Sequence, residues 1–529
     1  MHATGSADGL RAGIAPGPPV RWWESRWGVV ALLVLAAVPL AWPAVPPLGD
    51  LPGHMGRYRV ELDIASFPGL QRFYSFHWRF IGNLGVDLLV IPLTGLFGLE
   101  AAVKLIVMAI PVLTVGGFLW VSREIHGRIP AATLFALPLA YNYPFQFGFV
   151  NFCLSMALAL VAFALWLRLE RLGHRRLRAA LFVPLSLLIW TAHVYGWAVL
   201  CVLAFVVEAA RQLATGRRAL DAAVRSAFGC LALAPPLLAM AIWRGGHGGP
   251  VAEDWFDWPQ KAKYLNFALR DQWMVFDLLS LAVLLGPIGL AARRRKLAFS
   301  RELGFAALAL LVLFVLLPRV IFGSSYADMR LVPYIYAVAL LAVRPLPNAD
   351  VLFLRRLAWT GMAFLLLRSA ANTASLLIYD RSYRAELAAL DHLPEGARLV
   401  SFVGRTCGVR WWVTRLEHLP GLALERKRAF SNDQWDNAGG QPLTVAYSAA
   451  GGFARDPSQI VMPVGCEKPG YRPIDRALRE FPRQAFDYVW LIRPPAYAAS
   501  DAQGLQPVWR SGTSVLYRVV DRRQTAPRG

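Results

Sequence analysis

The sequence predicts an α-helical protein that crosses a membrane many times and ends in a small α/β domain outside the membrane. Of its 529 residues, 56% are hydrophobic and only 17% are charged, which is too apolar for an ordinary soluble domain. Long apolar runs recur as far as residue 378 and then stop. The net charge of +21 comes mostly from short loops between these runs, so a single nucleic-acid-binding patch is excluded.

The apolar runs predict about eleven transmembrane helices, although several are shorter than the roughly 20 residues of a straight span. Trp42 and Pro43 end the first run and form a poor cleavage site, so we expect an uncleaved anchor rather than a signal peptide. The predicted spans lie at residues 27–42, 101–121, 129–140, 148–167, 179–192, 195–207, 223–243, 275–290, 303–321, 331–343 and 359–378.

Arginine-rich loops predict the orientation of these spans. They lie at residues 123–128, 168–178, 211–225, 293–301 and 344–356, and they alternate with loops of low basic content such as 141–147. Because cytoplasmic loops of membrane proteins carry the excess of Lys and Arg, we expect a cytoplasmic N-terminus. The C-terminal domain is then expected on the outer side, in the periplasm or the extracellular space.

One further apolar segment, residues 83–97, affects this orientation. Counting it as a span would place every later arginine-rich loop outside, against the charge rule. We therefore expect a helix along the outer surface, interrupted by Pro92 and Gly95.

Three regions follow from this pattern. Residues 1–26 are predicted to be a disordered cytoplasmic tail, residues 27–378 the transmembrane module with a first outer loop at 44–100, and residues 379–529 the α/β domain. Within that domain the patterns predict a helix at 384–393 and strands at 398–403, 487–492 and 515–520. Cys407 and Cys466 both fall there; an exported domain permits a disulfide, but the sequence does not decide whether they pair.

The first outer loop holds the most informative polar residues. Asp50, His54 and Arg57 follow the first span closely. An acid, an imidazole and a guanidinium at a span exit are costly to bury, so they indicate a functional site. A solvated loop is the alternative interpretation.

Other polar residues are predicted to share this side of the membrane. Each has a structural alternative: an aromatic interfacial belt for residues 141–152, an interhelical hydrogen bond for an amide or imidazole, or a helix-capping ion pair. As binding residues we single out Tyr141, Asn142, Gln146, Asn151, His193, Asp328 and Arg330.

With a short tail, one span, a long outer loop with an acid near its start, further spans and an outer C-terminal domain, the chain resembles the GT-C glycosyltransferases over about residues 27–378. It is similar to the bacterial branch related to dolichyl-phosphate-mannose mannosyltransferases and lipopolysaccharide-modifying transferases. The resemblance implies that Asp50 is the general base, that the donor is a polyprenyl-phosphate sugar, and that the acceptor is an envelope glycan, lipid or protein. Direct displacement would invert the anomeric centre, with His54, Arg57 and Arg330 as candidates to bind the leaving phosphate.

The chain departs from better-known members of this family, many of which have two adjacent acids in the loop. Here Leu51 follows Asp50, and the nearest other acids are Glu61 and Asp63. Asp50 and His54 could instead bind a divalent metal, but Pro52 and Gly53 between them disfavour a regular helical pair, so we expect no metal and no cofactor.

Two other classes of function stay open. A lipid or glycan transporter would need acids or broken helices at the membrane midplane, and few such acids occur. A non-catalytic envelope assembly protein is compatible with the sequence. ATP-dependent, CxxC and HExxH zinc chemistry are disfavoured because their motifs are missing.

Overall fold

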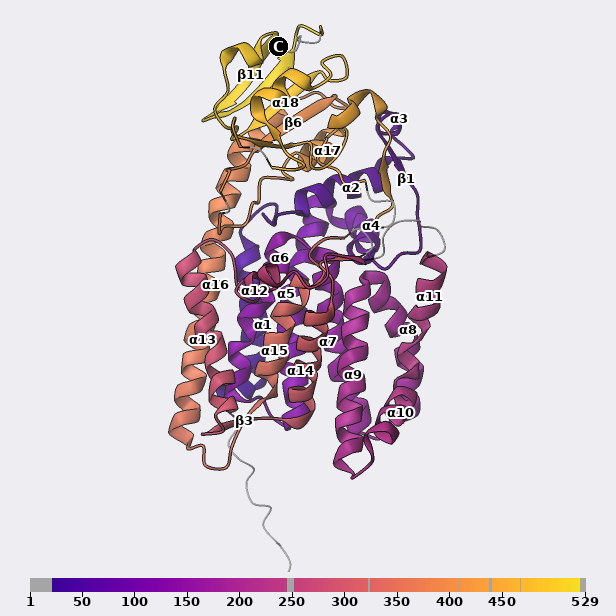
Figure 1. The fold of residues 1–529 in the computed structure, drawn as a ribbon, viewed down its shortest axis with the longest axis vertical. Helices are drawn as coiled ribbons and strands as arrows, with labels where there is room; N and C mark the ends of the chain where they lie inside the picture. Colours follow the sequence, from indigo (N-terminus) through magenta and orange to yellow (C-terminus); the bar gives the residue numbers. More distant parts are fainter. Residues whose placement is uncertain are drawn as a thin grey trace, which may run out of the picture.

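The fold is a bundle of helices with a sheet domain stacked on one end, as Figure 1 shows for this computed structural model. We call that end of the bundle the domain end and the opposite one the far end. The structure describes residues 21–244, 252–321, 324–408, 410–436, 440–466 and 468–523, so residues 1–20 of the predicted tail lie outside the described part.

The bundle is built from helices of very different lengths. Five helices of the described ranges are long and apolar enough to cross a membrane (α5, α7, α9, α13 and α16), and α10 with α11 forms a sixth if this pair, bent by 50°, is one span. The protein is therefore a multi-pass membrane protein, whereas the predicted number of about eleven spans is not confirmed. The bundle elements are η1 (Trp22–Glu24), α1 (Arg26–Ala41), α5 (Leu99–His126), η2 (Ala131–Phe135), η3 (Leu137–Tyr141), α6 (Tyr143–Phe147), α7 (Val150–Arg171), α8 (Arg175–Ala192), α9 (Val194–Ala214), α10 (Ala219–Gly229), η4 (Leu231–Leu233), α11 (Pro235–Arg244), α12 (Trp258–Leu265), α13 (Met274–Ala292), α14 (Arg301–Leu316), η5 (Met329–Leu331), α15 (Val332–Ala342) and α16 (Val351–Leu387).

The predicted span at 129–140 is not an α-helix. An ion pair of 2.8 Å between Glu100 and Arg426 places the start of α5 at the domain end, and its 28 residues carry the chain about 42 Å to the far end. The backbone N–H of Asp50 donates to the carbonyl of Phe147 at 2.8 Å, so the chain has returned by that point. The 3-10 helices η2 and η3 make this return, and they gain about 2.0 Å per residue.

The predicted arginine-rich loops meet at the far end. Arg128 pairs with Glu24 before α1 at 3.0 Å, and Arg171 at the end of α7 pairs with Glu124 of α5 at 2.8 Å. Strands β3 (Leu297–Phe299) and β5 (Val343–Pro345) join two more of these loops, and Figure 1 shows β3 at that end. The basic loops and the C-terminal domain thus lie at opposite ends of the bundle.

The first outer loop forms short helices at the domain end (Figure 1). Its elements are α2 (Leu51–Asp63), α3 (Pro68–Gln71), β1 (Tyr74–Phe76) and α4 (Gly85–Phe97). The 13 residues of α4 extend about 20 Å, which is too short for a hydrocarbon core of about 30 Å. This length and position agree with the surface helix predicted at 83–97.

The C-terminal domain contains a mixed six-stranded sheet in the order β11-β12-β10-β6-β8-β9. Strands β10, β6, β8 and β9 run parallel, and β12 is antiparallel to β10 and β11. The apolar run of β10 is almost wholly buried, as is typical of a central parallel strand. The domain elements are η6 (Ala388–His392), β6 (Leu399–Gly404), α17 (Gly421–Lys427), β7 (Leu443–Val445), η7 (Ser448–Phe453), β8 (Ile460–Met462), β9 (Arg472–Pro473), α18 (Ile474–Glu480), β10 (Tyr488–Ile492), η8 (Ala499–Ala502), β11 (Leu505–Ser511) and β12 (Ser514–Val519).

Helix α16 crosses the predicted domain boundary at residue 378 without a break. It has 37 residues, or about 55 Å, and its last turns enter the domain (Figure 1). Charged residues from Asp380 onward end the hydropathy run but not the helix. Strand β7 of the domain also pairs with β1 of the first outer loop, so the two parts share backbone hydrogen bonds.

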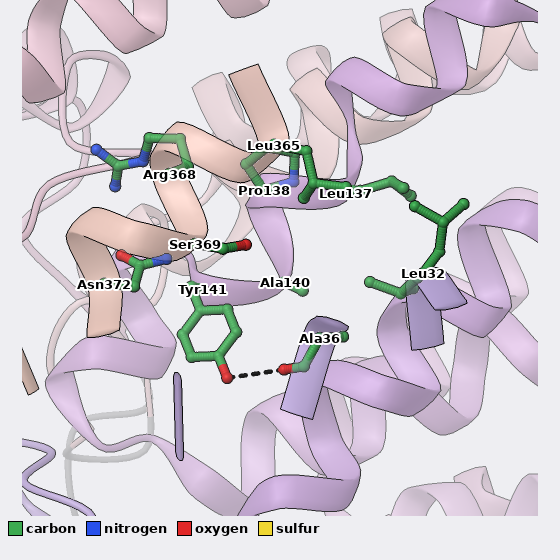
Figure 2. A pocket seen from close by; sticks show the side chains of 11 residues that line it. Leu32, Ala36, Leu137, Pro138, Ala140, Tyr141, Leu365, Arg368, Ser369 and Asn372 are labelled. Carbon is green, nitrogen blue, oxygen red and sulfur yellow. Dashed lines mark hydrogen bonds between the residues drawn. The ribbon is translucent and has the colours of Figure 1, made fainter. Parts of the chain in front are cut away.

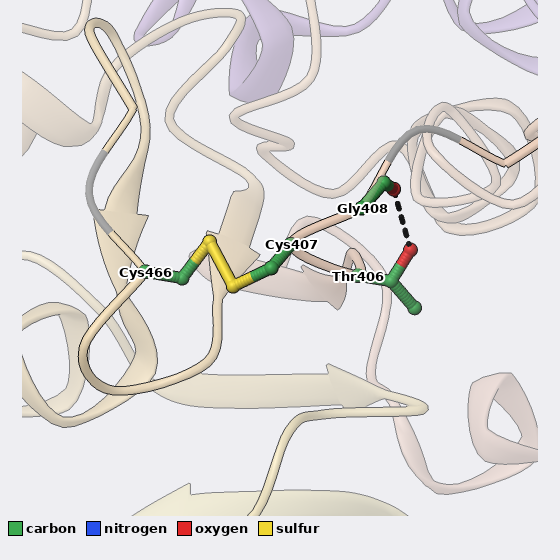
Figure 3. The surroundings of a disulfide bond; sticks show 4 residues. All are labelled: Thr406, Cys407, Gly408 and Cys466. Carbon is green, nitrogen blue, oxygen red and sulfur yellow. Dashed lines mark hydrogen bonds between the residues drawn. A yellow bond between two sulfur atoms is a disulfide. The ribbon is translucent and has the colours of Figure 1, made fainter.

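A disulfide joins Cys407 and Cys466, as Figure 3 shows, with an S–S distance of 2.10 Å. It links the loop after β6 to the loop after β8 and settles the pairing that the sequence left open. The two cysteines are 59 positions apart, so the bridge closes a loop that contains α17 and β7.

Candidate active site at the domain end

Asp50 is the N-cap residue of α2, and Pro52 lies in the first turn of this helix. Its backbone is fixed by the turn between α6 and α7 through the hydrogen bond to Phe147. Gly148 makes this approach possible: its φ is +103°, and a Cβ there would lie 2.5 Å from the Asp50 nitrogen. The bundle therefore sets the position of Asp50, while its side chain keeps 15% of its surface exposed.

The C-terminal domain brings His418 to Asp50. The His418 Nε2 atom lies 3.9 Å from Asp50 Oδ1 and 3.8 Å from Asp456 Oδ1, and Nδ1 lies 3.6 Å from Asp433 Oδ2. The indole of Trp435 packs against the imidazole with ring centroids 4.4 Å apart. We call these five residues the Asp50 cluster.

Burial and charge tune the acidity of Asp50. Burial raises its pKa to about 7, with Asp456 and Glu417 adding to the rise while His418 and Arg330 oppose it. A general base works best with a pKa near the operating pH, because it must be ionised and still accept a proton. The pKa of Asp50, about 7, therefore suits a general base near neutral pH.

Arg330 is a buried cation beside this cluster. Its guanidinium lies over the rings of Phe149 at 4.3 Å and Tyr195 at 5.8 Å, and it donates to Ser324 Oγ at 3.0 Å. Within the described ranges it forms no ion pair with a carboxylate, and its Nε has no hydrogen-bond partner. A guanidinium in this state is suited to a phosphate.

Arg57 and Asn151, both predicted to bind substrate, make bonds within the protein. Arg57 is 2% exposed, pairs with Asp87 of α4 at 2.8 Å and donates to Gln441 at 3.1 Å. The Asn151 amide accepts from the Val86 N–H at 2.6 Å and donates to Asp87 at 3.0 Å. The interhelical alternative for Asn151 is therefore observed, and both residues hold α4 in place.

Tyr141, Asn142 and Gln146 all form hydrogen bonds within the protein. Figure 2 shows the Tyr141 hydroxyl donating to the Ala36 carbonyl, at 2.8 Å, beside a cavity of about 10 Å³ that is too small for a sugar. Asn142 caps α6 by accepting from the Phe145 N–H at 3.1 Å. Gln146 accepts from Arg415 of the C-terminal domain at 2.7 Å.

The remaining predicted residues are His193, Asp328 and His54, which are held by helix caps, an ion pair and ring packing. His193 caps α9, with Nδ1 accepting from the Tyr195 N–H at 3.2 Å. Asp328 pairs with Lys261 at 2.9 Å and caps η5. His54 packs against Trp435 with ring centroids 4.9 Å apart, and its pKa lies well below the usual value because burial, Arg57 and His418 disfavour a second positive charge.

The contribution of the C-terminal domain to the Asp50 cluster was not predicted from the sequence. His418, Asp433 and Asp456 carry no spacing motif, and 368 positions separate Asp50 from His418. One pattern could have drawn attention to them: residues 431–436 form a polar run around Trp435 in a segment that is otherwise mixed. The catalytic role of Asp50 and the binding roles of the other nine predicted residues stay predictions.

The described ranges contain no group of three or more His, Cys, Asp or Glu side chains arranged to hold a metal ion. In the Asp50 cluster the carboxylates surround an imidazole and contact its nitrogens. The alternative of a metal between Asp50 and His54 therefore has no third protein ligand in this part of the chain.

Comparison with solved structures identifies the fold. The chain is similar to ArnT from Cupriavidus metallidurans in the apo state, with a TM-score of 0.51 and 15% identity over 95% of this chain and 99% of that one. It matches the same protein bound to undecaprenyl phosphate with a TM-score of 0.52 and 14% identity, over 94% of this chain and 98% of that one. ArnT is a GT-C glycosyltransferase. This chain has the GT-C fold. Protein-family models and curated protein sequences give no match.

The likeness extends beyond the predicted resemblance at residues 27–378. Because it covers nearly the whole chain, the GT-C fold here includes the sheet domain that supplies His418. The Asp50 cluster therefore lies between two parts of one fold.

Proposed function

We propose that this protein is a membrane glycosyltransferase that moves a sugar from a polyprenyl-phosphate donor to an envelope glycan, lipid or protein. The observation that carries the proposal is Asp50, a carboxylate with a pKa of about 7 at the domain end of a GT-C fold. The undecaprenyl phosphate bound by ArnT supports the class of donor.

In the proposed reaction, an acceptor hydroxyl attacks the anomeric carbon of the donor sugar. Asp50 takes the hydroxyl proton as the new carbon–oxygen bond forms, and the bond from the anomeric carbon to the phosphate oxygen breaks. A single displacement inverts the anomeric centre. The phosphate-linked donor is already activated, so the proposed reaction needs neither ATP nor a resident cofactor.

Negative charge develops on the leaving phosphate, and a cation must compensate for it. Arg330 is the strongest of the three predicted candidates because its charge is buried and has no carboxylate partner within the described ranges. Arg57 is already neutralised by Asp87, and the low pKa of His54 leaves that imidazole neutral.

We also propose that the domain end faces the periplasm or the cell exterior and that the N-terminus is cytoplasmic. Arginine-rich loops at the far end support this orientation. The Cys407–Cys466 disulfide supports it independently, because such bonds persist in oxidising compartments.

The test is Asp50→Asn, which keeps the size of the side chain and removes the base. Cells producing this variant in place of the wild type are expected to lose the transferred sugar from their envelope glycans and lipids, as measured by mass spectrometry, with unchanged membrane insertion. Asp254→Asn is the matched control because Asp254 is exposed and lies outside the Asp50 cluster. Unchanged profiles in Asp50→Asn would favour an assembly protein or a transporter.

A further inference from the structure

His418 occupies an unusual position for a histidine at a domain junction. It is 6% exposed and lies in the segment between β6 and α17, yet it approaches the loop that leads into α2. Opposite charges within about 4–6 Å favour the charged form of a titratable group. Here both ring nitrogens face carboxylate oxygens, Nε2 toward Asp50 and Asp456 and Nδ1 toward Asp433. This geometry suits the doubly protonated, cationic form.

Packing fixes the imidazole in this place. Trp435 covers one face of the ring, and the adjacent residue of α2 is Gly53, whose missing side chain leaves room. A Cβ on Gly53 would lie 2.8 Å from the Trp435 ring and 3.2 Å from His418 Nδ1.

The segment that carries His418 is also tied to the bundle. The indole N–H of Trp411 donates to Asp277 of α13 at 2.7 Å, and Arg415 donates to Asp271 at 2.6 Å. Three residues beyond Arg415, the chain reaches His418. The bundle therefore holds both sides of the contact between His418 and Asp50.

We propose that His418 is a positioning residue of the C-terminal domain, a fixed positive charge that keeps Asp50 ionised and oriented for proton transfer. This role rests on the proposed function, in which Asp50 is the general base. The contact between His418 and Asp50 can nevertheless be tested without measuring transfer.

The electrostatics agree with this geometry. The pKa of His418 is raised to about 10: burial lowers it, and Asp433, Asp456 and Asp50 raise it by more. The charge of His418 lowers the pKa of Asp50 in turn. Without that charge, burial and the neighbouring acids would raise the pKa of Asp50 further above about 7. The titratable and charged groups that face this pair are Asp433, Asp456 and Glu417 of the C-terminal domain, His54 of α2, Tyr143 of α6, and Arg330 of η5.

The experiment measures the pKa of the Asp50 carboxyl directly in the full-length protein. Infrared spectra of protein with ¹³C-labelled aspartate follow the protonated carboxyl band with pH, and the Asp50→Asn spectrum is subtracted to isolate Asp50. In His418→Gln we expect the titration midpoint to move upward by about one pH unit or more, since a charge near 4 Å is lost. His418→Lys restores a charge and should move the midpoint back toward the wild type.

The matched control is His392→Gln, the same change at an exposed histidine of the same domain, and it should leave the midpoint unchanged. If His418→Gln does not fold, Asp433→Asn serves instead: it weakens protonation of His418 and should move the midpoint in the same direction by less. An unmoved midpoint in the folded variant, or an equal shift in His392→Gln, overturns the proposal.

Measuring transfer activity in the same variants distinguishes failure of the His418 role from failure of the proposed function. If both hold, the acid limb of the pH profile of transfer moves upward with the spectroscopic midpoint in His418→Gln. Full activity in Asp50→Asn would overturn the role of Asp50 as base and therefore the positioning role. In that case an upward spectroscopic shift would still show the electrostatic contact by itself.

Discussion

At the scale of single residues, the partners of a buried polar group indicate whether its role is structural or chemical. Arg57 and Asp87 satisfy one another inside the fold, and Asn151 bonds the same carboxylate. Arg330 contacts aromatic rings, a hydroxyl and a backbone carbonyl, and it forms no ion pair with a carboxylate within the described ranges. A buried charge that already has a partner destabilises the fold when that partner is removed, whereas a buried charge without one can neutralise a ligand.

Asp87→Ala should therefore destabilise the protein strongly. It leaves the Arg57 charge buried and removes an acceptor of Asn151, and breaking a buried pair in this way costs about 3–5 kcal/mol. Thermal or denaturant unfolding of the purified protein in detergent measures the loss. Asp221→Ala is the control, because Asp221 pairs with Arg217 and Arg225 on an exposed helix surface and should change stability little. Equal effects of the two substitutions would contradict this account of α4.

At the scale of elements, the contact between α2 and α17 depends on glycines. Besides Gly53, Gly421 at the start of α17 lies so close to α2 that a Cβ would be 2.4 Å from the Pro52 carbonyl oxygen. Neither glycine has a positive φ, so close approach rather than backbone conformation explains them. This contact is what brings His418 next to Asp50.

Gly53→Ala should push α2 away from Trp435 and His418. The added methyl group overlaps the Trp435 ring, and we expect a loss of about 1–3 kcal/mol together with reduced transfer. Gly95→Ala in α4 is the same change in a helix where nothing lies within 4 Å of the new Cβ. It should be neutral or stabilise by up to about 1 kcal/mol, because Ala favours helix more than Gly. Unfolding of both variants side by side measures the contrast, which a destabilised Gly95→Ala would contradict.

At the scale of the whole molecule, the sheet domain is joined to the rest of the protein by backbone and side-chain contacts: α16 runs into it, β7 pairs with β1, and Trp411 and Arg415 bond to Asp277 and Asp271. The disulfide acts within the domain. The loop that it closes contains His418, Asp433, Trp435 and Asp456, which are the four residues that the domain contributes to the Asp50 cluster.

Replacing both Cys407 and Cys466 with Ser should destabilise the domain and weaken the cluster. Closing a loop of 59 positions stabilises a fold by roughly 4 kcal/mol in the loop-entropy model. Limited proteolysis and unfolding, each with and without reductant, measure the effect. Reductant should lower the stability of the wild type to that of the double variant. Cys201→Ser controls for loss of a thiol because Cys201 is free, and a reductant effect that persists in the double variant would contradict the prediction.

Much of this fold could be predicted because hydropathy is a local property. The membrane class, the sheet domain with its strands near 398–403, 487–492 and 515–520, and the grouping of basic loops at one end follow from patterns within short windows. The GT-C fold was predicted instead from a resemblance in the order of elements along the chain. The number of spans is not confirmed: η2 and η3 are 3-10 helices, and α10 bends by 50° into α11.

For the site, the amino-acid pattern alone predicts an acid at the first span exit, on the side opposite the arginine-rich loops. The partners of the side chains there are set by the folded chain. Arg57 and Asn151 are bound to α4, and His418 reaches Asp50 from 368 positions away. The partner of a buried polar group depends on packing between distant segments, and a pattern along the chain does not contain that information.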